Sequence, residues 1–368
     1  MNKILIVSFH AVDNYGAVLQ NYALQAAIGA LGFQAETLDY RPGAIDTSYP
    51  DYFWPRNTNG AGEFVRKLAR YTYNYIKKFA RQASFQHFRS TYLRLTKEMA
   101  KQELSAVNGQ YDVFITGSDQ VWNMDIITEA ELDTYTLQFV HDGKRAAYAA
   151  SVGSCRNITP PLVERISTFD YISVREHSLK ERLEQCGLTG VREVCDPVFL
   201  LEKERWEQLL PIAGAHEKPY VFVYYVSSKD ICRLTEEIAA ERGLEIRHVD
   251  KRKTLTVGFG TSMYGIGPAE FISYIARAET VVVSSFHGLA FAILFEKEFL
   301  VIHHPSRGDR TRDLLDALGL SDRGFEGYED YCLRKDSMRP IDWPAVKEKL
   351  TEIRENSRDV LRDICNLP

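Results

Sequence analysis

Short apolar segments alternate with helix-like segments along nearly the whole chain, and this alternation limits the possible folds more than any other feature. Residues 3–9 (KILIVSF) predict a buried strand, residues 16–33 an alanine-rich helix ended by Gly32, and residues 35–40 a second strand. Two strands joined through a helix form a βαβ unit, which implies a parallel sheet. The first forty residues therefore predict the start of a Rossmann-like domain.

The alternation continues in two series, with a break in composition at residues 202–219. The other predicted strands are 111–119, 145–153, 169–176 and 191–199 before the break, then 220–228, 244–250, 279–285 and 298–304 after it. A chain of 368 residues is also long for a single core. We therefore predict an α/β protein in which two Rossmann-like domains, residues 1–205 and 206–368, face a central cleft. A long C-terminal helix is expected to pack back.

Composition argues against several classes of protein. The net charge of −5 gives no indication of nucleic-acid binding. The six cysteines form no CxxC pair, which argues against zinc ribbons and iron–sulfur clusters, so we expect no metal and no cofactor. Scattered cysteines fit a reducing cytoplasm. The N-terminus lacks a signal-peptide cleavage site, and no apolar run reaches the roughly 20 residues of a membrane span. A cytoplasmic protein is expected.

Residues 62–94 form a basic segment, predicted to be helical, that is rich in aromatic residues. A single acid, Glu63, accompanies eight basic residues: Arg66, Lys67, Arg70, Lys77, Lys78, Arg81, Arg89 and Arg94. Helices of this composition can lie on an anionic membrane surface, which would bring the protein to the inner membrane face. More often, such a helix is solvated on one side and packs its aromatic side on the domain. The sequence leaves both interpretations open.

Two corners in the first half carry groups suited to anions or sugar hydroxyls. Asn14, Tyr15 and Gly16 stand where the first helix begins, and backbone N–H groups at a helix start can bind an acceptor or phosphate. Ser118 and Asp119 end a predicted strand, where a carboxylate can orient a sugar hydroxyl or act as a base. The same residue types also cap helices, and capping alone would be enough to select them.

Arginines stand at further corners. Arg175 ends a predicted strand just before a helix, where its guanidinium could bind a carboxylate or phosphate in bidentate fashion. A surface ion pair is the more usual fate of an arginine. Downstream, Arg307 and Arg310 lie in a loop and helix start that could hold a dianion or be an ordinary charged loop.

The stretch SSFHGLAFA contains the most informative corner, because an apolar strand turns there into an apolar helix. Ser284 and Ser285 end the strand, His287 begins the helix, and Gly288 permits the close approach of another group. An isolated histidine in such a segment is usually a core residue bonded to backbone. The serine pair, the glycine and the corner position favour function here, because a helix start attracts anions and a histidine can transfer protons.

Five motifs, in this order, give the chain a pattern that resembles the polysaccharide pyruvyl transferase family. They are NYGAVLQNYALQ (14–25), GSDQVWN (117–123), SVREHS (173–178), CDPVFLL (195–201) and SSFHGLAFAILFEKEF (284–299). Each is weak alone, and the five in order are fairly specific. The resemblance runs from about Asn14 to about Leu320 and implies two Rossmann-like domains arranged as in the GT-B glycosyltransferases.

The resemblance also implies a reaction, the transfer of a pyruvyl group from phosphoenolpyruvate onto a sugar to give a cyclic ketal and phosphate. By resemblance, His287 is the acid or base, Arg175 binds the donor, and Asp119 orients or deprotonates a sugar hydroxyl. Three more residues of the SSFHGLAFA stretch are candidates for binding the donor: Ser284, Ser285 and Gly288. We call this stretch the donor corner. The first domain would bind a glycan acceptor, for which a polyprenyl-diphosphate carrier is expected, and the second domain the donor.

One position departs from the family pattern. Members of the family that this chain resembles have an Arg-x-His pattern at this corner. In this chain the position two before His287 is Ser285 instead of arginine. A serine cannot replace the charge of a guanidinium. Our hypothesis is that Arg307 or Arg310 supplies it.

Two other functions remain open at this point. A GT-B glycosyltransferase with a nucleotide-sugar donor would use the same architecture and could place Glu270 on the ribose. It would need an apolar slot for the base, whereas phosphoenolpyruvate needs only packed cations. A non-catalytic sugar-binding or assembly protein would keep the fold and tolerate the loss of His287.

Overall fold

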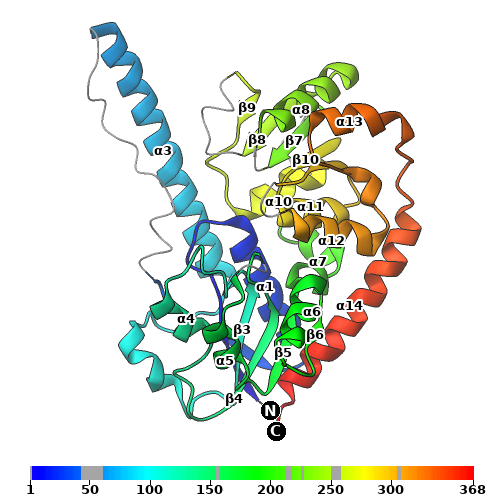
Figure 1. Cartoon of the computed structure of the whole chain (residues 1–368). Helices are drawn as coiled ribbons and strands as arrows, with labels where there is room; N and C mark the ends of the chain where they lie inside the picture. Colours follow the sequence, from blue (N-terminus) through cyan, green and yellow to red (C-terminus); the bar gives the residue numbers. More distant parts are fainter. Residues whose placement is uncertain are drawn as a thin grey trace.

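The computed structural model describes residues 2–42, 61–154, 157–211, 218–224, 228–249, 258–304 and 308–368, with only the backbone of 61–71 and 73–75. These residues form two parallel six-stranded sheets, one from each half of the chain. In Figure 1 the first sheet lies below the second, and helices pack around each. The predicted α/β architecture with two Rossmann-like halves is confirmed. The boundary predicted near residue 205 falls between the last strand of one sheet and the first strand of the other and stays a prediction.

The first sheet has the strand order β2-β1-β3-β4-β5-β6. Its strands are β1 (Lys3–Val7), β2 (Gln34–Thr37), β3 (Val113–Asp119), β4 (Lys144–Ala150), β5 (Tyr171–Val174) and β6 (Arg192–Glu193). Because β1 lies between β2 and β3, the connections that lead to these two neighbours place them on opposite sides of β1. Residues Ile4 to Val7 are at most 1% exposed, as expected for a strand covered on both faces. The crevice beyond the carboxyl ends of β1 and β3 is therefore the natural ligand position in this sheet.

The second sheet has the order β12-β11-β10-β7-β8-β9. Its strands are β7 (Tyr220–Tyr224), β8 (Glu245–Val249), β9 (Thr261–Ser262), β10 (Thr280–Val283), β11 (Glu298–Ile302) and β12 (Gly324–Phe325). Here β7 lies between β8 and β10, so the equivalent crevice lies beyond β7 and β10.

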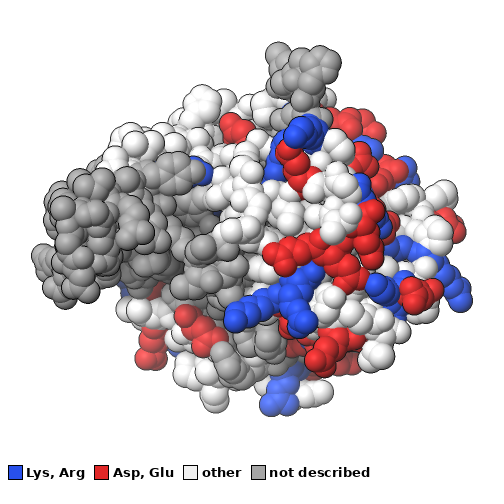
Figure 2. Space-filling view, turned by 90° about the horizontal axis from the view of Figure 1, so that it is seen from above, with Lys and Arg blue, Asp and Glu red and all other residues white. Residues whose placement is uncertain are grey.

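The described α-helices connect these strands. They are α1 (Tyr15–Ala30), α3 (Ala61–Tyr92), α4 (Glu129–Tyr135), α5 (Pro160–Ile166), α6 (His177–Gln185), α7 (Lys203–Glu207), α8 (Lys229–Arg242), α10 (Pro268–Arg277), α11 (Phe286–Leu294), α12 (Asp309–Leu318), α13 (Tyr328–Arg334) and α14 (Trp343–Cys365). None of them is long and apolar enough to cross a membrane. Figure 2 shows acidic and basic side chains interspersed over the described part of the face seen from above.

The C-terminal helix α14 packs back onto the first half of the chain, as predicted. The Arg354 guanidinium donates to the Phe199 carbonyl at 2.6 Å, and the Cys195 backbone N–H donates to Ser357 Oγ at 2.9 Å. The Asn2 amide also donates to the Cys365 carbonyl at 3.0 Å, which brings the two ends of the chain together (Figure 1). These contacts fix the two halves against each other.

The basic segment forms one long helix, α3, whose first part projects beyond the rest of the molecule (Figure 1). Near its C-terminal end Phe85 and Phe88 are buried, so this part packs on the domain as an ordinary surface helix would. Farther out, Ile76 and Phe79 are 61% and 67% exposed. The helix therefore has a packed end and an end that exposes apolar side chains.

The segment 191–199, predicted to be one strand, is mostly not a strand. Only Arg192–Glu193 pairs with β5, and Pro197–Leu200 forms a 3-10 helix. Proline has no N–H for a strand ladder, and Asp196 Oδ1 accepts a hydrogen bond from the Val198 N–H at 3.1 Å. The Asp196 carboxylate thereby caps the 3-10 helix, and the strand ends before it.

Candidate functional site

Arg175 is the central cation of a buried cluster between the two sheets. It follows β5, and its side chain is 3% exposed. Its Nη1 donates to Asp196 Oδ2 at 2.7 Å and its Nε to Glu176 Oε1 at 3.0 Å, while Nη2 lies 3.5 Å from Asp119 Oδ1. Burial alone would lower the pKa of Arg175, but the carboxylates of Glu176, Asp196 and Asp119 raise it. This guanidinium is thus a fixed positive charge.

Asp196 joins the guanidinium to the histidine of the second half. Burial would raise its pKa, but His287 and Arg175 hold the pKa of Asp196 well below the usual value. His287 Nε2 lies 3.4 Å from Asp196 Oδ2. The contact is an electrostatic one rather than a well-aligned hydrogen bond, because Nε2 meets no hydrogen-bond geometry with the described residues. Ser118 Oγ completes the carboxylate's surroundings by donating to Oδ2 at 3.4 Å.

His287 stands on the first turn of α11, where β10 ends. Ser285 caps this helix, and its Oγ accepts from the Gly288 N–H at 3.0 Å. The imidazole rests against the start of α1: a Cβ added to Gly16 would lie 2.6 Å from both Cγ and Cε1 of the ring. The crevices of the two sheets therefore meet at Gly16 and His287.

Asp119 and Arg310 form the other side of the cluster. Asp119 ends β3 with φ 76°, a left-handed conformation that aspartate tolerates better than most residues. Its N–H donates to Ser118 Oγ at 2.6 Å. Arg310, on the first turn of α12, brings Nη1 to 3.9 Å from Asp119 Oδ1. Arg175 and Arg310 thus flank one carboxylate from opposite halves of the chain.

A cavity of about 300 Å³ adjoins this cluster and is bounded by α12 and α14. Its lining includes Arg175, Asp196, Phe286, Arg310 and Asp313. The Phe286 ring stacks under the Arg175 guanidinium, with 4.6 Å between ring centroid and Cζ. Burial, followed by the neighbouring Glu176 carboxylate, raises the pKa of Asp313 to about 6. The cavity is in the size range of small-molecule sites. Its charged lining consists of Arg175 and Arg310, the carboxylates of Glu176, Glu193 and Asp196, and Asp313, whose carboxyl group can hold a proton near pH 6.

The structure places some candidates in packing or capping positions instead. Asn14 is the N-cap of α1, and its side chain accepts from the Ala17 N–H at 3.3 Å. Tyr15 is fully buried, stacks on Phe271 at 4.2 Å and donates to the Ile266 carbonyl at 2.9 Å, so it holds the two halves together.

Two further candidates, Ser284 and Gly288, lie at the donor corner. Ser284 is buried at the end of β10, and Gly288 packs so tightly that a Cβ there would lie 2.8 Å from Val283 Cγ1. Arg307 lies outside the described residues. Glu270, the residue considered for a ribose, caps α10 by accepting from the Gly267 N–H at 3.1 Å.

Sequence reasoning missed Asp196 and Glu176, although both lie within quoted motifs. A second missed group is the buried pair of His10 Nε2 and Asp39 Oδ1, which are 2.9 Å apart beyond the carboxyl ends of β1 and β2. Burial would raise the pKa of Asp39, but His10 and Arg41 hold it well below the usual value. The sequence could have indicated this pair through its position at strand ends, since His10 follows β1 and Asp39 follows β2.

Comparisons with known proteins identify the family and the fold. The family model for polysaccharide pyruvyl transferase matches residues 14–306. No curated protein matches the chain.

Among solved structures, the S. aureus MnaA–UDP co-structure is similar with a TM-score of 0.53 and 11% identity, covering 96% of this chain and 91% of that one. The UDP-GlcNAc 2-epimerase of Neisseria meningitidis gives 0.48 and 10%, covering 100% and 95%. The E. coli heptosyltransferase WaaC gives 0.42 and 13%, covering 95% and 99%. At 11% identity the likeness to the S. aureus structure, whose TM-score is above 0.5, concerns the fold alone, and the expected GT-B-like arrangement is confirmed.

Proposed function

This chain belongs to the polysaccharide pyruvyl transferase family, and from that membership we propose that it transfers the pyruvyl group of phosphoenolpyruvate to two hydroxyls of one sugar. The product is a cyclic ketal, and phosphate is released. The observation that supports this reaction best is the buried junction of Arg175, Asp196 and His287, with Arg310 beside it. Two fixed cations suit a donor that carries a carboxylate and a phosphate.

The reaction needs a proton at one carbon and the loss of protons from two hydroxyls. Protonation of the methylene carbon makes the methyl group and leaves positive charge on C2. The first sugar oxygen then bonds to C2. The C2–O bond to phosphate breaks, and the second sugar oxygen takes its place. One hydroxyl proton is accounted for by the methyl group and the other by the released phosphate.

The cluster supplies groups for each of these steps. His287 is the proposed proton carrier, because it lies at the meeting point of the two crevices, with its Nε2 3.4 Å from Asp196 Oδ2. Asp119 would orient or deprotonate the sugar hydroxyl. Arg175 and Arg310 would offset the charge of the carboxylate and the departing phosphate. N–H groups at the start of α1, near Gly16, and Ser118 would contact acceptor or phosphate.

We propose that the acceptor is a glycan on a polyprenyl-diphosphate carrier, used in the synthesis of a bacterial exopolysaccharide, capsule or cell-wall polymer. The protein would then work in the cytoplasm, at the inner membrane face. The basic composition of α3, together with the exposed Ile76 and Phe79, supports such peripheral contact.

A thermal-shift titration with phosphoenolpyruvate, beside a panel of nucleotide sugars, tests the donor without knowledge of the acceptor. A ligand at about 100 times its Kd should add roughly 2.7 kcal/mol to the free energy of unfolding, enough to raise the Tm by several degrees. Stabilisation by phosphoenolpyruvate alone supports the proposal. Stabilisation by one nucleotide sugar alone would contradict it and assign a glycosyltransferase reaction.

A further inference from the structure

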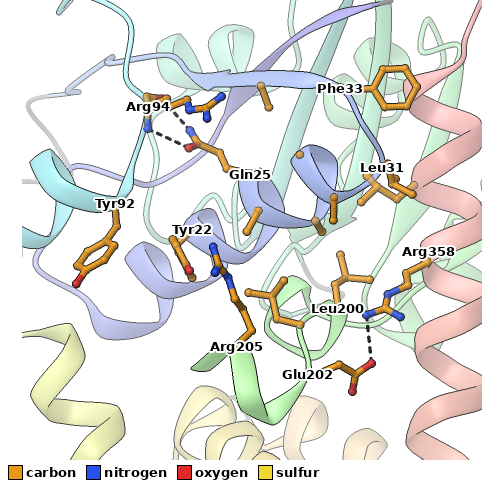
Figure 3. Close-up of a pocket in the computed structure, with 17 residues that line it drawn as sticks. Tyr22, Gln25, Leu31, Phe33, Tyr92, Arg94, Leu200, Glu202, Arg205 and Arg358 are labelled. Carbon is orange, nitrogen blue, oxygen red and sulfur yellow. Dashed lines mark hydrogen bonds and ion pairs between the residues drawn. The ribbon is translucent and has the colours of Figure 1, made fainter. Parts of the chain in front are cut away.

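A large cavity of the described residues lies away from the Arg175 cluster, on the outer side of α1. It measures about 810 Å³, and a second cavity of about 420 Å³ shares Tyr22, Tyr92, Arg94 and Arg205 with it. Figure 3 shows the larger cavity between α1, the end of α3, the segment around Leu200 and helix α14. We call the two together the α1 groove.

One part of the α1 groove is apolar. Its floor is made by the outer face of α1 together with side chains from β2, the 3-10 helix and α14: Ala26, Ala27, Gly29, Ala30, Leu31, Phe33, Ala35, Leu200, Leu201 and Leu361. From Tyr22 to Leu31 this face is about 14 Å long at the rise of an α-helix. A Cβ added to Gly29 would meet no atom within 4 Å, so the groove is open above this residue. The floor offers a narrow apolar track to a linear chain.

The other part carries two arginines. Figure 3 shows Arg94, Tyr92 and Arg205 at one end of the groove and Leu31 and Phe33 at the other. Among the residues that the structure describes, neither Arg94 nor Arg205 forms an ion pair with a carboxylate. Arg205 Nη1 instead donates to the neutral Gln208 Oε1 at 2.8 Å.

The other two charged side chains that line the groove, Arg358 and Glu202, form an ion pair with each other. Arg358 Nη2 lies 3.3 Å from the Glu202 carboxylate, which also pairs with Arg354. The positive charge that faces the opening is therefore concentrated at the Arg94 and Arg205 end, and this end suits an anion.

We propose that the α1 groove binds an amphiphile with a phosphate or diphosphate head and a single apolar chain. The head lies between Arg94 and Arg205, and the chain lies along α1 toward Phe33. The site is separate from the Arg175 cluster, because Gly29 is thirteen residues along α1 from Gly16, about 20 Å. The further step, that this amphiphile is the carrier lipid of the glycan acceptor, rests on the proposed function; binding itself does not.

Calorimetric titration with farnesyl phosphate tests the binding, with farnesol and inorganic pyrophosphate as ligands that lack the head or the tail. The wild-type protein is expected to bind farnesyl phosphate at least about tenfold more tightly than either, since head and tail contacts both contribute. Gly29→Trp should abolish binding by filling the groove. Arg94→Gln combined with Arg205→Gln should weaken it about tenfold or more.

Two matched variants control for nonspecific effects. Ala240→Trp adds the same side chain to an exposed position of another helix, α8. Arg182→Gln removes an arginine that donates to Gln185 at 3.1 Å with the same spacing as Arg205 and Gln208. Both should bind farnesyl phosphate as the wild type does.

Several outcomes would overturn the proposal: no binding of farnesyl phosphate, equal binding by Gly29→Trp, or equal affinity for pyrophosphate. Binding to phosphatidylglycerol vesicles without binding of farnesyl phosphate would also overturn it, in favour of a membrane surface. None of these readouts requires turnover, so the pyruvyl-transfer proposal can fail while this one stands, and the reverse.

Discussion

The backbone of Gly16 lies directly against the imidazole of His287, so closely that a Cβ at position 16 would overlap the ring. Gly16 lies on the first turn of α1 in the first half, and His287 lies on the first turn of α11, which follows the central strand β10 of the second half. The contact between the halves and the candidate acid/base site are therefore the same place. A small change on one half should alter the proton-transferring group on the other.

Gly16→Ala should reduce kcat by about a hundredfold, because a displaced imidazole loses its alignment with the reacting atoms. Ala240→Val is the matched control, since it adds methyl groups at an exposed position of another helix, α8. That variant should keep its activity and lose less than about 1 kcal/mol of stability to helix propensity. Phosphate release and urea unfolding would be measured for both variants. Equal activity of the two would mean that the position of His287 does not matter.

His287→Ala should lower turnover by about 10²- to 10⁴-fold, the usual contribution of a positioned acid or base. The fold should persist, because the residue is at a helix start and Ser285 still caps the helix. Circular dichroism would verify the fold, and phosphate release the activity. Activity within a few-fold of the wild type would instead favour a non-catalytic role for this corner.

Replacing Arg310 and Arg307 by Ala should raise the KM for phosphoenolpyruvate, because one of them is expected to supply the charge that Ser285 lacks. Arg310 is the better-placed candidate among the described residues, since its Nη1 lies 3.9 Å from Asp119 Oδ1, inside the cluster. Single variants would separate the two. An unchanged KM in the double variant would show that neither arginine binds the donor.

Asp313→Asn should raise the Tm above pH 6 and leave it unchanged near pH 4. Burial and nearby carboxylates raise the pKa of Asp313 to about 6, above its usual value near 4. Between these pH values the folded protein binds more protons than the unfolded one, so the stability contribution is lost as the pH rises through 6. Asparagine does not ionise, so the variant does not lose this stability as the pH rises. The exposed Asp359→Asn serves as control, and a Tm difference that grows toward acid would contradict the sign.

The alternation of strands and helices predicted most of the fold, because buried parallel strands read as short apolar runs between helices. It did not find α4 and α5, which have seven residues each and are too short to show a period. For α4 a local signal existed: Thr128 and Glu131 form a capping box.

The candidate site was only partly predictable. His287 and Arg175 stand at strand ends, a position that sequence can reveal. Asp196 was missed because an acid before a proline reads as an ordinary turn, and its role arises only where β5, β6 and α11 meet. The pair His10 and Asp39 is separated by 29 positions and joined only by strand pairing.

Arg175→Met should destabilise the protein by about 3–5 kcal/mol, because it leaves the buried Asp196 carboxylate without its nearest cation. Adding Asp196→Asn should recover part of that loss but not all of it, since Glu176 and Asp119 also face the missing guanidinium. Arg362→Met is the control: its pair with Asp359 is exposed and should contribute less than about 1 kcal/mol. Urea unfolding of Arg175→Met, Asp196→Asn, the double variant and Arg362→Met would measure this coupling. If the double variant is as unstable as the sum of the two single ones, the buried charges act independently, and the cluster is not the coupled unit that the proposed mechanism requires.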